Sequence, residues 1–219
     1  MQKYFSVLRN CPLFHEVADA DLGALLSCLD VREASYPRRS VIFAEGDEAS
    51  AFGIVLRGMV QMIRTDYYGN RSIVSNVGVS GIFAEAFVCA EAERIPVSVV
   101  AVEDTDVLLV DYRRMMRSCS NACVFHQQMI YNLMRELAEK TIRFHEKLEI
   151  TAHRSTREKL LAYLRQQAKA AGSTHFEIPF DRQELADYLE VERSGLSAEI
   201  SKLRREGILE SERKSFTLL

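Results

Sequence analysis

The sequence predicts an α+β protein in three consecutive parts: an antiparallel, jelly-roll-like β-roll, a long helix, and a small helical unit with a β edge. Three observations predict this order. Short β runs separated by turn residues fill the region from Val31 to Val110. The stretch from Asn121 to Ile150 contains no Gly or Pro. Two short helices with apolar stripes, followed by β runs, come after Asp181.

The length, composition and charge of the chain limit the classes of protein to which it can belong. The chain has 219 residues, 47% of them hydrophobic, so one or two domains with an ample core are expected. The net charge of −3 gives no global attraction to nucleic acid or to an anionic membrane. The first ten residues lack the apolar core of a signal peptide, and no run reaches the ~18 apolar residues of a membrane span. Five cysteines fit reduced thiols, so we expect a cytoplasmic protein with no membrane partner.

The first 118 residues are expected to form one sensor domain. Residues 1–30 are predicted to be helical, with Asp19 as a cap and Leu22, Leu25, Leu26 and Leu29 on one face. The β runs that follow predict a small antiparallel roll or barrel. They are VIFAEGDEA, FGIVLRGMVQMIRT, RSIVSNV, SVVAV and DVLLVDY.

Residues 119–150 are predicted to form a long dimerisation helix of ~45 Å. Its apolar side chains alternate steps of four and three, which is the seam of a coiled coil. The seam consists of Ile130, Met134, Leu137, Thr141, Phe144 and Leu148. A helix much longer than its roll needs indicates that a second copy of the chain packs on it. The alternative is that the stripe packs along its own barrel.

Residues 151–219 are expected to form a winged helix-turn-helix. Ser155 or Thr156 caps a helix over 157–170, which Gly172 ends, and HFEIPF forms a β piece. Asp181 caps a first short helix over 182–188, and a second runs over 192–206. Gly207 supplies a left-handed backbone, and residues 208–209 and 216–218 pair as the wing.

The second short helix buries Leu196, Ile200 and Leu203, which leaves a face of small and basic side chains. Such a face can enter a major groove, where Arg binds guanine and Ser binds base or phosphate. The predicted contacts to double-stranded DNA are Arg193, Ser194, Ser197, Ala198, Ser201 and, on the first helix, Arg182. Residues 181–219 hold seven Lys/Arg and nine Asp/Glu, so phosphate attraction must come from local placement. The alternative is a hairpin packed only for stability.

This order of parts resembles the CRP/FNR family of bacterial transcription regulators over essentially the whole chain. The resemblance is carried by Cys11-Pro12-Leu13-Phe14, Ile42-Phe43-Ala44-Glu45-Gly46-Asp47, Gly53-Ile54-Val55-Leu56-Arg57-Gly58-Met59-Val60, Phe83-Ala84-Glu85-Ala86 and Asp181-Arg182-Gln183-Glu184-Leu185-Ala186. It implies a homodimer on a palindromic operator, an effector or redox signal sensed in the roll, and RNA polymerase as a candidate partner. Activation and repression are not distinguished by the sequence.

The chain departs from the family where cyclic AMP would bind. Members that bind it use Gly-Glu-Leu and, some ten residues on, Arg-Ser. Glu85 keeps the Glu, but Ile95-Pro96 stand at the Arg-Ser position, and Arg94 could serve only if the register slips. A phosphate loses its bidentate partner, so cyclic AMP is not expected and the small-molecule effector is unidentified. Glu85 either holds a different ligand or bonds backbone amides. The expected effector pocket is Phe83, Glu85, Ala86, Ile95, Pro96 and Val97.

Other sensing chemistries are poorly supported by the sequence, and no cofactor is assigned. Iron–sulfur relatives need a cysteine cluster that Cys11, Cys28, Cys89, Cys119 and Cys123 do not form. Cys119 and Cys123 could form a thiol switch or half a metal site, although buried inert thiols are commoner. Haem would need an axial ligand such as Cys89, His126 or His145.

Three residues of the second short helix bear on which operator sequence the protein recognises. Arg193 matches the first Arg of the family pattern, but Ser194 stands for the usual Glu and Ala198 for the second Arg. The operator should therefore differ from the best-known family consensus.

Two further function classes are alternatives to a DNA-binding regulator. The sequence disfavours a metal-dependent enzyme in the roll, because none of the five histidines lies between Val31 and Val110. A ligand-sensing regulatory subunit that acts through protein contacts and binds no DNA is the main alternative, and the acidic balance of 181–219 is its only support.

Overall fold

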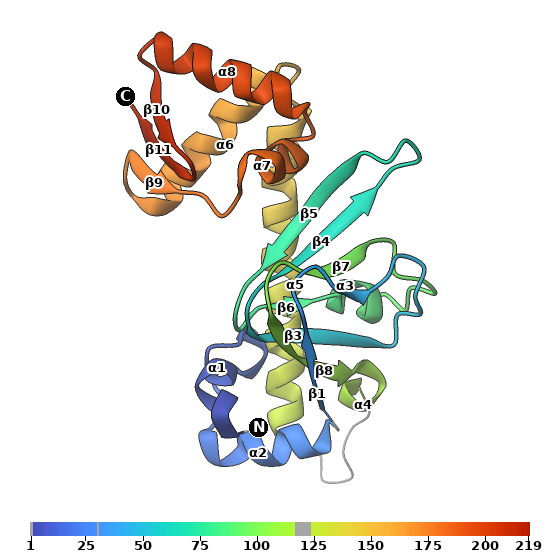
Figure 1. Ribbon diagram of the computed structural model, residues 1–219. Helices are drawn as coiled ribbons and strands as arrows, with labels where there is room; N and C mark the ends of the chain where they lie inside the picture. The colour runs from blue at the N-terminus through green and yellow to red at the C-terminus, as the bar shows by residue number, and fades with distance from the viewer. Residues whose placement is uncertain (1, 30, 117–123) are drawn as a thin grey trace. The chain divides into compact units, whose positions relative to one another are not determined.

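The computed structural model describes residues 2–29, 31–116 and 124–219 (Figure 1). The chain divides into two compact units. The first comprises Met1–Asn70 and Val74–Lys140, and the second comprises Arg71–Ile73 and Thr141–Leu219. The long helix α5, Val124–Ala152, contributes to both units. The division into residues 1–118, 119–150 and 151–219 therefore stays a prediction.

The roll is built from two four-stranded sheets, and all of it except residues 71–73 of β5 belongs to the first unit (Figure 1). One sheet has the order β1 (Arg32–Tyr36), β8 (Thr105–Asp111), β3 (Ala51–Arg57) and β6 (Ile82–Phe83). The other has the order β2 (Val41–Phe43), β7 (Ser98–Ala101), β4 (Val60–Thr65) and β5 (Arg71–Val77). All five predicted β runs contain strands, and the longest divides at Gly58 into β3 and β4. Strands β1 and β6 were not predicted individually, because β1 is polar and largely exposed and β6 has only two residues.

Strands β3 and β8 are buried on both faces of their sheet. Ile54 and Leu108 pack toward the N-terminal helices and α5, whereas Val55 and Val107 pack inside the roll. Alternate residues point to opposite faces of a strand. Because both faces of these strands lie in apolar environments, their sequences are nearly continuous apolar runs and do not alternate between apolar and polar residues.

The backbone of β3 closely approaches one aromatic ring at Gly53. This residue pairs with Phe83 of β6, and the ring of Phe83 lies over it. A Cβ at Gly53 would lie 2.0 Å from Cζ of Phe83. Glycine is therefore required here for close approach rather than for a turn. The ring contact fixes the chain two residues before Glu85.

The helices before the roll pack on the outer face of β3 and on α5 (Figure 1). They are η1 (Gln2–Tyr4), α1 (Phe5–Arg9), η2 (Pro12–Phe14) and α2 (Asp19–Cys28). The predicted apolar face of α2 is confirmed, since Leu22, Leu25 and Leu26 in the helix and Leu29 at its C-cap are all buried. The prediction that Asp19 caps this helix is wrong. Ala18 is the N-cap and makes no side-chain bond, while the Asp19 carboxylate pairs with the guanidinium of Arg9.

Asp106 of β8 ties the N-terminal segment to the roll. Its carboxylate accepts hydrogen bonds from Nε of Arg57, the hydroxyl of Ser35 and the hydroxyl of Tyr4, each at 2.7 Å. These three donors, the Arg57 guanidinium first, hold the pKa of Asp106 well below its ordinary value. A nearly buried carboxylate with three donors joins residues up to 102 positions apart.

The second unit is a three-helix core with a three-stranded sheet of order β10-β11-β9 (Figure 1). Its elements are α6 (Thr156–Ala171), β9 (His175–Glu177), α7 (Arg182–Leu189), α8 (Arg193–Arg205), β10 (Leu209–Glu212) and β11 (Ser215–Leu218). Of the two predicted caps, Ser155 is the N-cap of α6, where it forms a capping box with Glu158. Gly172 ends the helix as predicted, in a left-handed conformation. Tyr163, Phe180 and Tyr188 form the aromatic part of its core.

The two remaining helices of the roll are short: α3 spans Glu85–Cys89 and α4 spans Tyr112–Met116. Within the described residues, no helix is both long and apolar enough to span a bilayer.

Candidate nucleic-acid interface and effector pocket

Helices α7 and α8 form the predicted helix-turn-helix. Asp181 caps α7, since its carboxylate accepts from the amide of Glu184 while the Glu184 carboxylate accepts from the amide of Asp181. The connection begins with Glu190, whose φ of 54° and ψ of 56° are left-handed. Nζ of Lys159 on α6 donates to the carbonyls of Leu189 and Glu190, at 3.3 Å each. The turn between the helices is thus fixed by side chains at both ends of α7.

The apolar face of α8 is buried and its opposite face is exposed. Leu196, Ile200 and Leu203 are buried against the core, as predicted. The five α8 residues proposed to contact DNA all lie in the exposed set: Arg193, Ser194, Ser197, Ala198 and Ser201. Lys202, Arg204 and Arg205 are also exposed and add positive charge toward the end of the helix. The helix therefore presents small side chains at its start and a basic end.

Four of the nine acidic residues of 181–219 are used in capping or in ion pairs with Arg157. Arg157 of α6 donates to Glu199 at 3.2 Å and to Glu206 at 2.6 Å. The hydrogen bond from Arg157 lowers the pKa of Glu206, so this carboxylate is ionised and paired. Asp181 and Glu184 are used in the capping box. The Arg157 pairs therefore offset the charge of two α8-side carboxylates, while Glu210 and Glu212 of the wing stay exposed beside the groove.

Arg182 has a different environment from the other five predicted contacts. Its guanidinium lies 4.9 Å from the centroid of the Phe216 ring, and Nη2 donates to the hydroxyl of Ser211 at 3.2 Å. Burial, and then the neighbouring charge of Arg204, lower the pKa of Arg182. These contacts join the start of α7 to the wing strands.

A groove of about 1030 Å³ runs between α8 and the wing. Sequence reasoning did not single out Arg213, which lies between the wing strands with a φ of 49° and lines this groove. A turn between two β runs that contains adjacent basic residues was the available signal. The groove is lined by His175, Ser201, Arg204, Arg205, Leu209, Glu210, Ser211, Glu212, Arg213, Ser215 and Thr217.

In the first unit, Glu85 is the first residue of α3 and follows Ala84, whose φ of 65° is left-handed. The Glu85 side chain is only 2% exposed. Nζ of Lys140, on α5, donates to Oε1 of Glu85 at 2.6 Å and to the carbonyl of Ile82 at 2.6 Å. The Lys140 ammonium also lies 3.9 Å from Oε1 of Glu136, one turn earlier on α5. Neither the partner nor the pairing was predicted from the sequence.

The other five predicted pocket residues divide by burial. Phe83, Ile95 and Val97 are buried in the core of the roll, whereas Ala86 and Pro96 are exposed. Backbone bonds fix the register here, since the amide of Ile95 donates to Asp47 and its carbonyl accepts from Gly46, both at 2.8 Å. The apolar Ile95 side chain thus points inward. Arg94 is exposed and donates through Nη1 to the Gly46 carbonyl at 3.0 Å.

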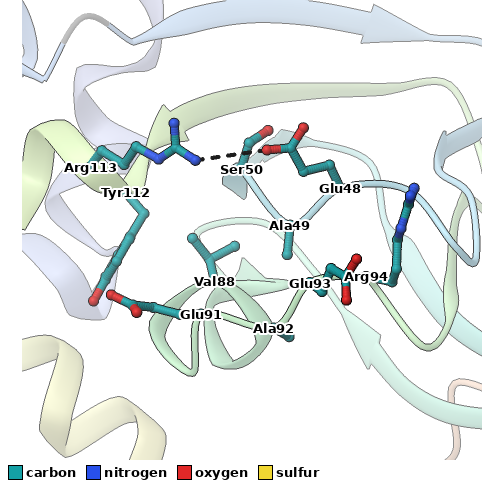
Figure 2. Close-up of a pocket in the computed structure, with 10 residues that line it drawn as sticks. All are labelled: Glu48, Ala49, Ser50, Val88, Glu91, Ala92, Glu93, Arg94, Tyr112 and Arg113. Carbon is teal, nitrogen blue, oxygen red and sulfur yellow. Dashed lines mark ion pairs between the residues drawn. The ribbon is translucent and has the colours of Figure 1, made fainter.

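A pocket of about 520 Å³ opens beside α3 and α4 in the roll (Figure 2). None of the six predicted effector residues lines it. Two guanidiniums and three carboxylates face it over an aliphatic floor, and Arg113 pairs with Glu48 at 3.8 Å. Its lining residues are Glu48, Ala49, Ser50, Val88, Glu91, Ala92, Glu93, Arg94, Tyr112 and Arg113.

The described thiols lie in two kinds of environment. Cys11 is buried, which raises its pKa to about 12, and burial also raises the pKa of Cys89 to about 11. Thiols of such pKa are almost entirely protonated at neutral pH and react slowly. Cys28 is exposed. Cys119 and Cys123 lie outside the described residues.

No metal-binding group emerges from the part of the chain that the structure describes. Among those residues, no three His, Cys, Asp or Glu side chains are placed to hold a metal ion. Of the two candidate haem ligands on α5, His145 is exposed.

The predicted seam of α5 is largely exposed in a single copy of the chain. Met134, Phe144 and Leu148 are 58%, 45% and 62% exposed, and Thr141 is exposed as well. Ile130 and Leu137 are partly buried, and Leu137 packs on the core of the first unit. Tyr131 and Ile142 are also exposed on this helix. An apolar surface of this kind on one helix commonly marks an interface.

Two family models match the chain. A cyclic nucleotide-binding domain covers residues 33–122, and a Crp-like helix-turn-helix domain covers residues 158–219. The chain is similar to transcriptional activator protein FnrL of Cereibacter sphaeroides, with 23% identity over 227 residues that span 96% of this chain and 86% of the relative.

Solved structures share the fold. The c-di-GMP-responsive regulator CLP of Xanthomonas campestris has a TM-score of 0.76 and 17% identity, over 92% of this chain and 99% of CLP. FixK2 from Bradyrhizobium japonicum has a TM-score of 0.65 and 21% identity, over 86% of this chain and 92% of FixK2.

Proposed function

Because the chain belongs to the CRP/FNR family of transcription regulators, we propose that it acts as a homodimer that reads a palindromic operator through α8. The family consists of regulators rather than enzymes. The observation that carries the proposal is the exposed face of α8, which combines small side chains with Arg193 at its start and basic residues at its end.

The charges around α8 support this role. Residues 181–219 are acidic in total, but Arg157 neutralises Glu199 and Glu206 on the side of α8 that faces α6. The exposed side carries the basic residues Arg193, Lys202, Arg204 and Arg205. The serines on this side are small, so the helix can lie close to the walls of a DNA major groove. Arg193 is assigned to guanine, Ser194 and Ser197 to base or phosphate bonds, and Ala198 to a thymine methyl. Ser201 is assigned to the phosphate side of the same face.

Arg182 is assigned an indirect role at the interface. Its guanidinium packs on Phe216 and bonds Ser211, so it holds the wing beside α8. A direct phosphate contact would require it to leave a half-buried position. Arg213, at the wing turn, is exposed and is better placed to reach the backbone of the duplex.

The dimer is proposed to form along the exposed seam of α5. Met134, Thr141, Phe144 and Leu148 would face the same residues of a second copy, since a two-fold interface brings equivalent surfaces together. Burying these side chains would remove the exposed apolar surface of the helix. Two copies of α8 would then enter successive major grooves ~34 Å apart.

The signal is proposed to be something other than cyclic AMP. Ile95 fills the place of a phosphate-binding arginine with an apolar side chain that is 1% exposed. A thiol signal through Cys11 or Cys89 is disfavoured by their raised pKa values. The roll pocket of Figure 2, with its arginines and carboxylates, is a better location for a small polar effector. Because a similar regulator is c-di-GMP-responsive, c-di-GMP belongs in the panel of ligands tested.

The experiment is a titration of labelled duplex, by fluorescence anisotropy, with the parent protein and two variants. Arg193→Ala should weaken specific binding by roughly 5- to 150-fold and relax preference at one base pair. The matched control is Arg165→Ala, an exposed arginine of α6 outside the interface, which should bind like the parent. Equal affinity of Arg193→Ala and parent would refute the assignment of α8.

The regulatory-subunit alternative is separated by the same titration. A protein that acts only through protein contacts would show no sequence preference at any salt concentration. The proposed regulator should show specific binding that falls steeply as salt rises, because each phosphate contact releases counterions.

A further inference from the structure

The roll contains a buried ionic cluster that spans two separate elements. Glu85 begins α3, whereas Lys140 and Glu136 lie on α5, 51 or more positions later. The Glu85 carboxylate is 2% exposed and Glu136 is also buried. Buried carboxylates require a charged or hydrogen-bonding partner, and Lys140 is within 4 Å of both.

The Lys140 ammonium makes contacts of the kind that a bound ligand would make. It donates to a carboxylate oxygen of α3 and to the carbonyl of Ile82 in β6, both at 2.6 Å. Those two groups lie on either side of Phe83 and the left-handed Ala84 in the chain. One primary ammonium thus contacts both ends of the short connection from β6 to α3.

Lys140 also occupies a particular place along α5. Earlier on the helix, Met129 and Leu133 are buried in the core of the first unit, and Nδ2 of Asn132 donates to the carbonyls of Leu13 and His15 at 3.1 and 2.7 Å. From Thr141 to Glu146 every residue is exposed, and the first unit ends at Lys140. Lys140 is therefore the last residue of α5 that belongs to the first unit, and its ammonium attaches α5 to α3 and β6 within that unit.

We propose that Lys140 is an internal ligand of the roll: its ammonium takes the Glu85 carboxylate and so fixes α5 to α3 and β6 without a bound nucleotide. The site accepts a primary ammonium from the same chain. This inference rests on the proposed function only for its effect on DNA. The chain should then bind its operator without any added cyclic nucleotide.

The test is a mutant cycle of Lys140→Met, Glu85→Met and the double variant, followed by thermal unfolding. Each single variant leaves buried groups without their partner, so its Tm should fall by roughly 6 to 10 °C. The double variant replaces the Glu85–Lys140 pair by apolar side chains of similar size and should recover the part of that loss that comes from Glu85, while Glu136 still lacks its ion pair with Lys140. The control is Arg135→Met on the same helix, where the exposed pair with Glu139 should matter little.

Hydrogen exchange shows which parts of the chain are loosened when Lys140 is replaced. In Lys140→Met the amides of 85–89 and 136–140 should exchange faster than in the parent, while those of α6, α7 and α8 in the second unit should not change. The mutant cycle would overturn the proposal if Lys140→Met melted within about 1 °C of Arg135→Met. A marked rise in the Tm of the parent on adding cyclic AMP or cyclic GMP would also overturn it, because a nucleotide would then be the ligand of this corner.

Operator binding separates this proposal from the proposed function. Parent affinity should be unchanged by cyclic AMP, and Lys140→Met should bind more weakly than Arg135→Met. If the parent bound no duplex, the proposed function would fail, while the unfolding and exchange measurements would still decide the role of Lys140.

Discussion

Replacing Gly53 with alanine tests how tightly the corner before Glu85 is packed. The added Cβ would lie 2.0, 2.4 and 2.6 Å from three atoms of the Phe83 ring, where ordinary contacts are 3.5 Å or more. Phe83 is fully buried, so the ring has no solvent to move into. Overpacking of this kind costs about 2 kcal/mol or more, which corresponds to a fall in Tm of roughly 4 to 8 °C.

The assay is urea unfolding of Gly53→Ala, Phe83→Leu and the double variant. Phe83→Leu removes the ring atoms that the new methyl would meet, so Gly53→Ala should cost much less in its presence than alone. Gly78→Ala is the control, because nothing lies within 4 Å of a Cβ there. If Gly53→Ala changed the free energy of unfolding by less than about 0.5 kcal/mol, or if the two changes were additive, the close approach would not exist in solution.

Three further changes follow from particular residues. Glu190→Gly should stabilise the protein by about 1 kcal/mol in thermal unfolding, because a left-handed backbone strains every residue with a Cβ; a loss of stability would contradict this. Asp106 has a pKa below its unfolded value of about 3.9, so its stabilisation is present above that pH and is lost as pH falls below it. Asp106→Asn should therefore lower the stability of the protein at pH 7, and the variant should lose less stability than the parent when the pH falls. The measurement is the urea unfolding midpoint of each protein at pH 7 and pH 3; an equal loss in both proteins would count against the role given to Asp106. Arg157→Ala should weaken DNA binding several-fold at low salt, because the unpaired carboxylates of Glu199 and Glu206 would then repel the DNA phosphates. Unchanged affinity would show that these two carboxylates are too far from the DNA to affect binding.

The sequence was sufficient for the elements that depend on local patterns. The apolar spacing of Leu196, Ile200 and Leu203 predicts α8, and Asp181 with Glu184 predicts the start of α7. The cap assigned to Asp19 failed because the helix begins one residue earlier than predicted: Ala18 holds the N-cap position, and Asp19 lies in the first turn and pairs with Arg9. A capping pattern states which bond is available, whereas the folded chain decides which bond forms.

Features that depend on distant residues could not be read from the sequence. The pairing of Glu85 with Lys140 joins two positions 55 residues apart, and no local spacing indicates it. The same holds for Arg157, which neutralises two carboxylates of α8 from α6. The acidic total of 181–219 does not show which carboxylates are paired, because charge composition counts side chains without their partners.

The most direct test of the central claim is selection of bound duplexes from a randomised pool by the parent protein, followed by sequencing. A homodimer that places one α8 in each of two grooves should enrich an inverted repeat whose half-sites are centred about one helical turn, ~34 Å, apart. Enrichment of a single unpaired site, or of no sequence at all, would contradict the account.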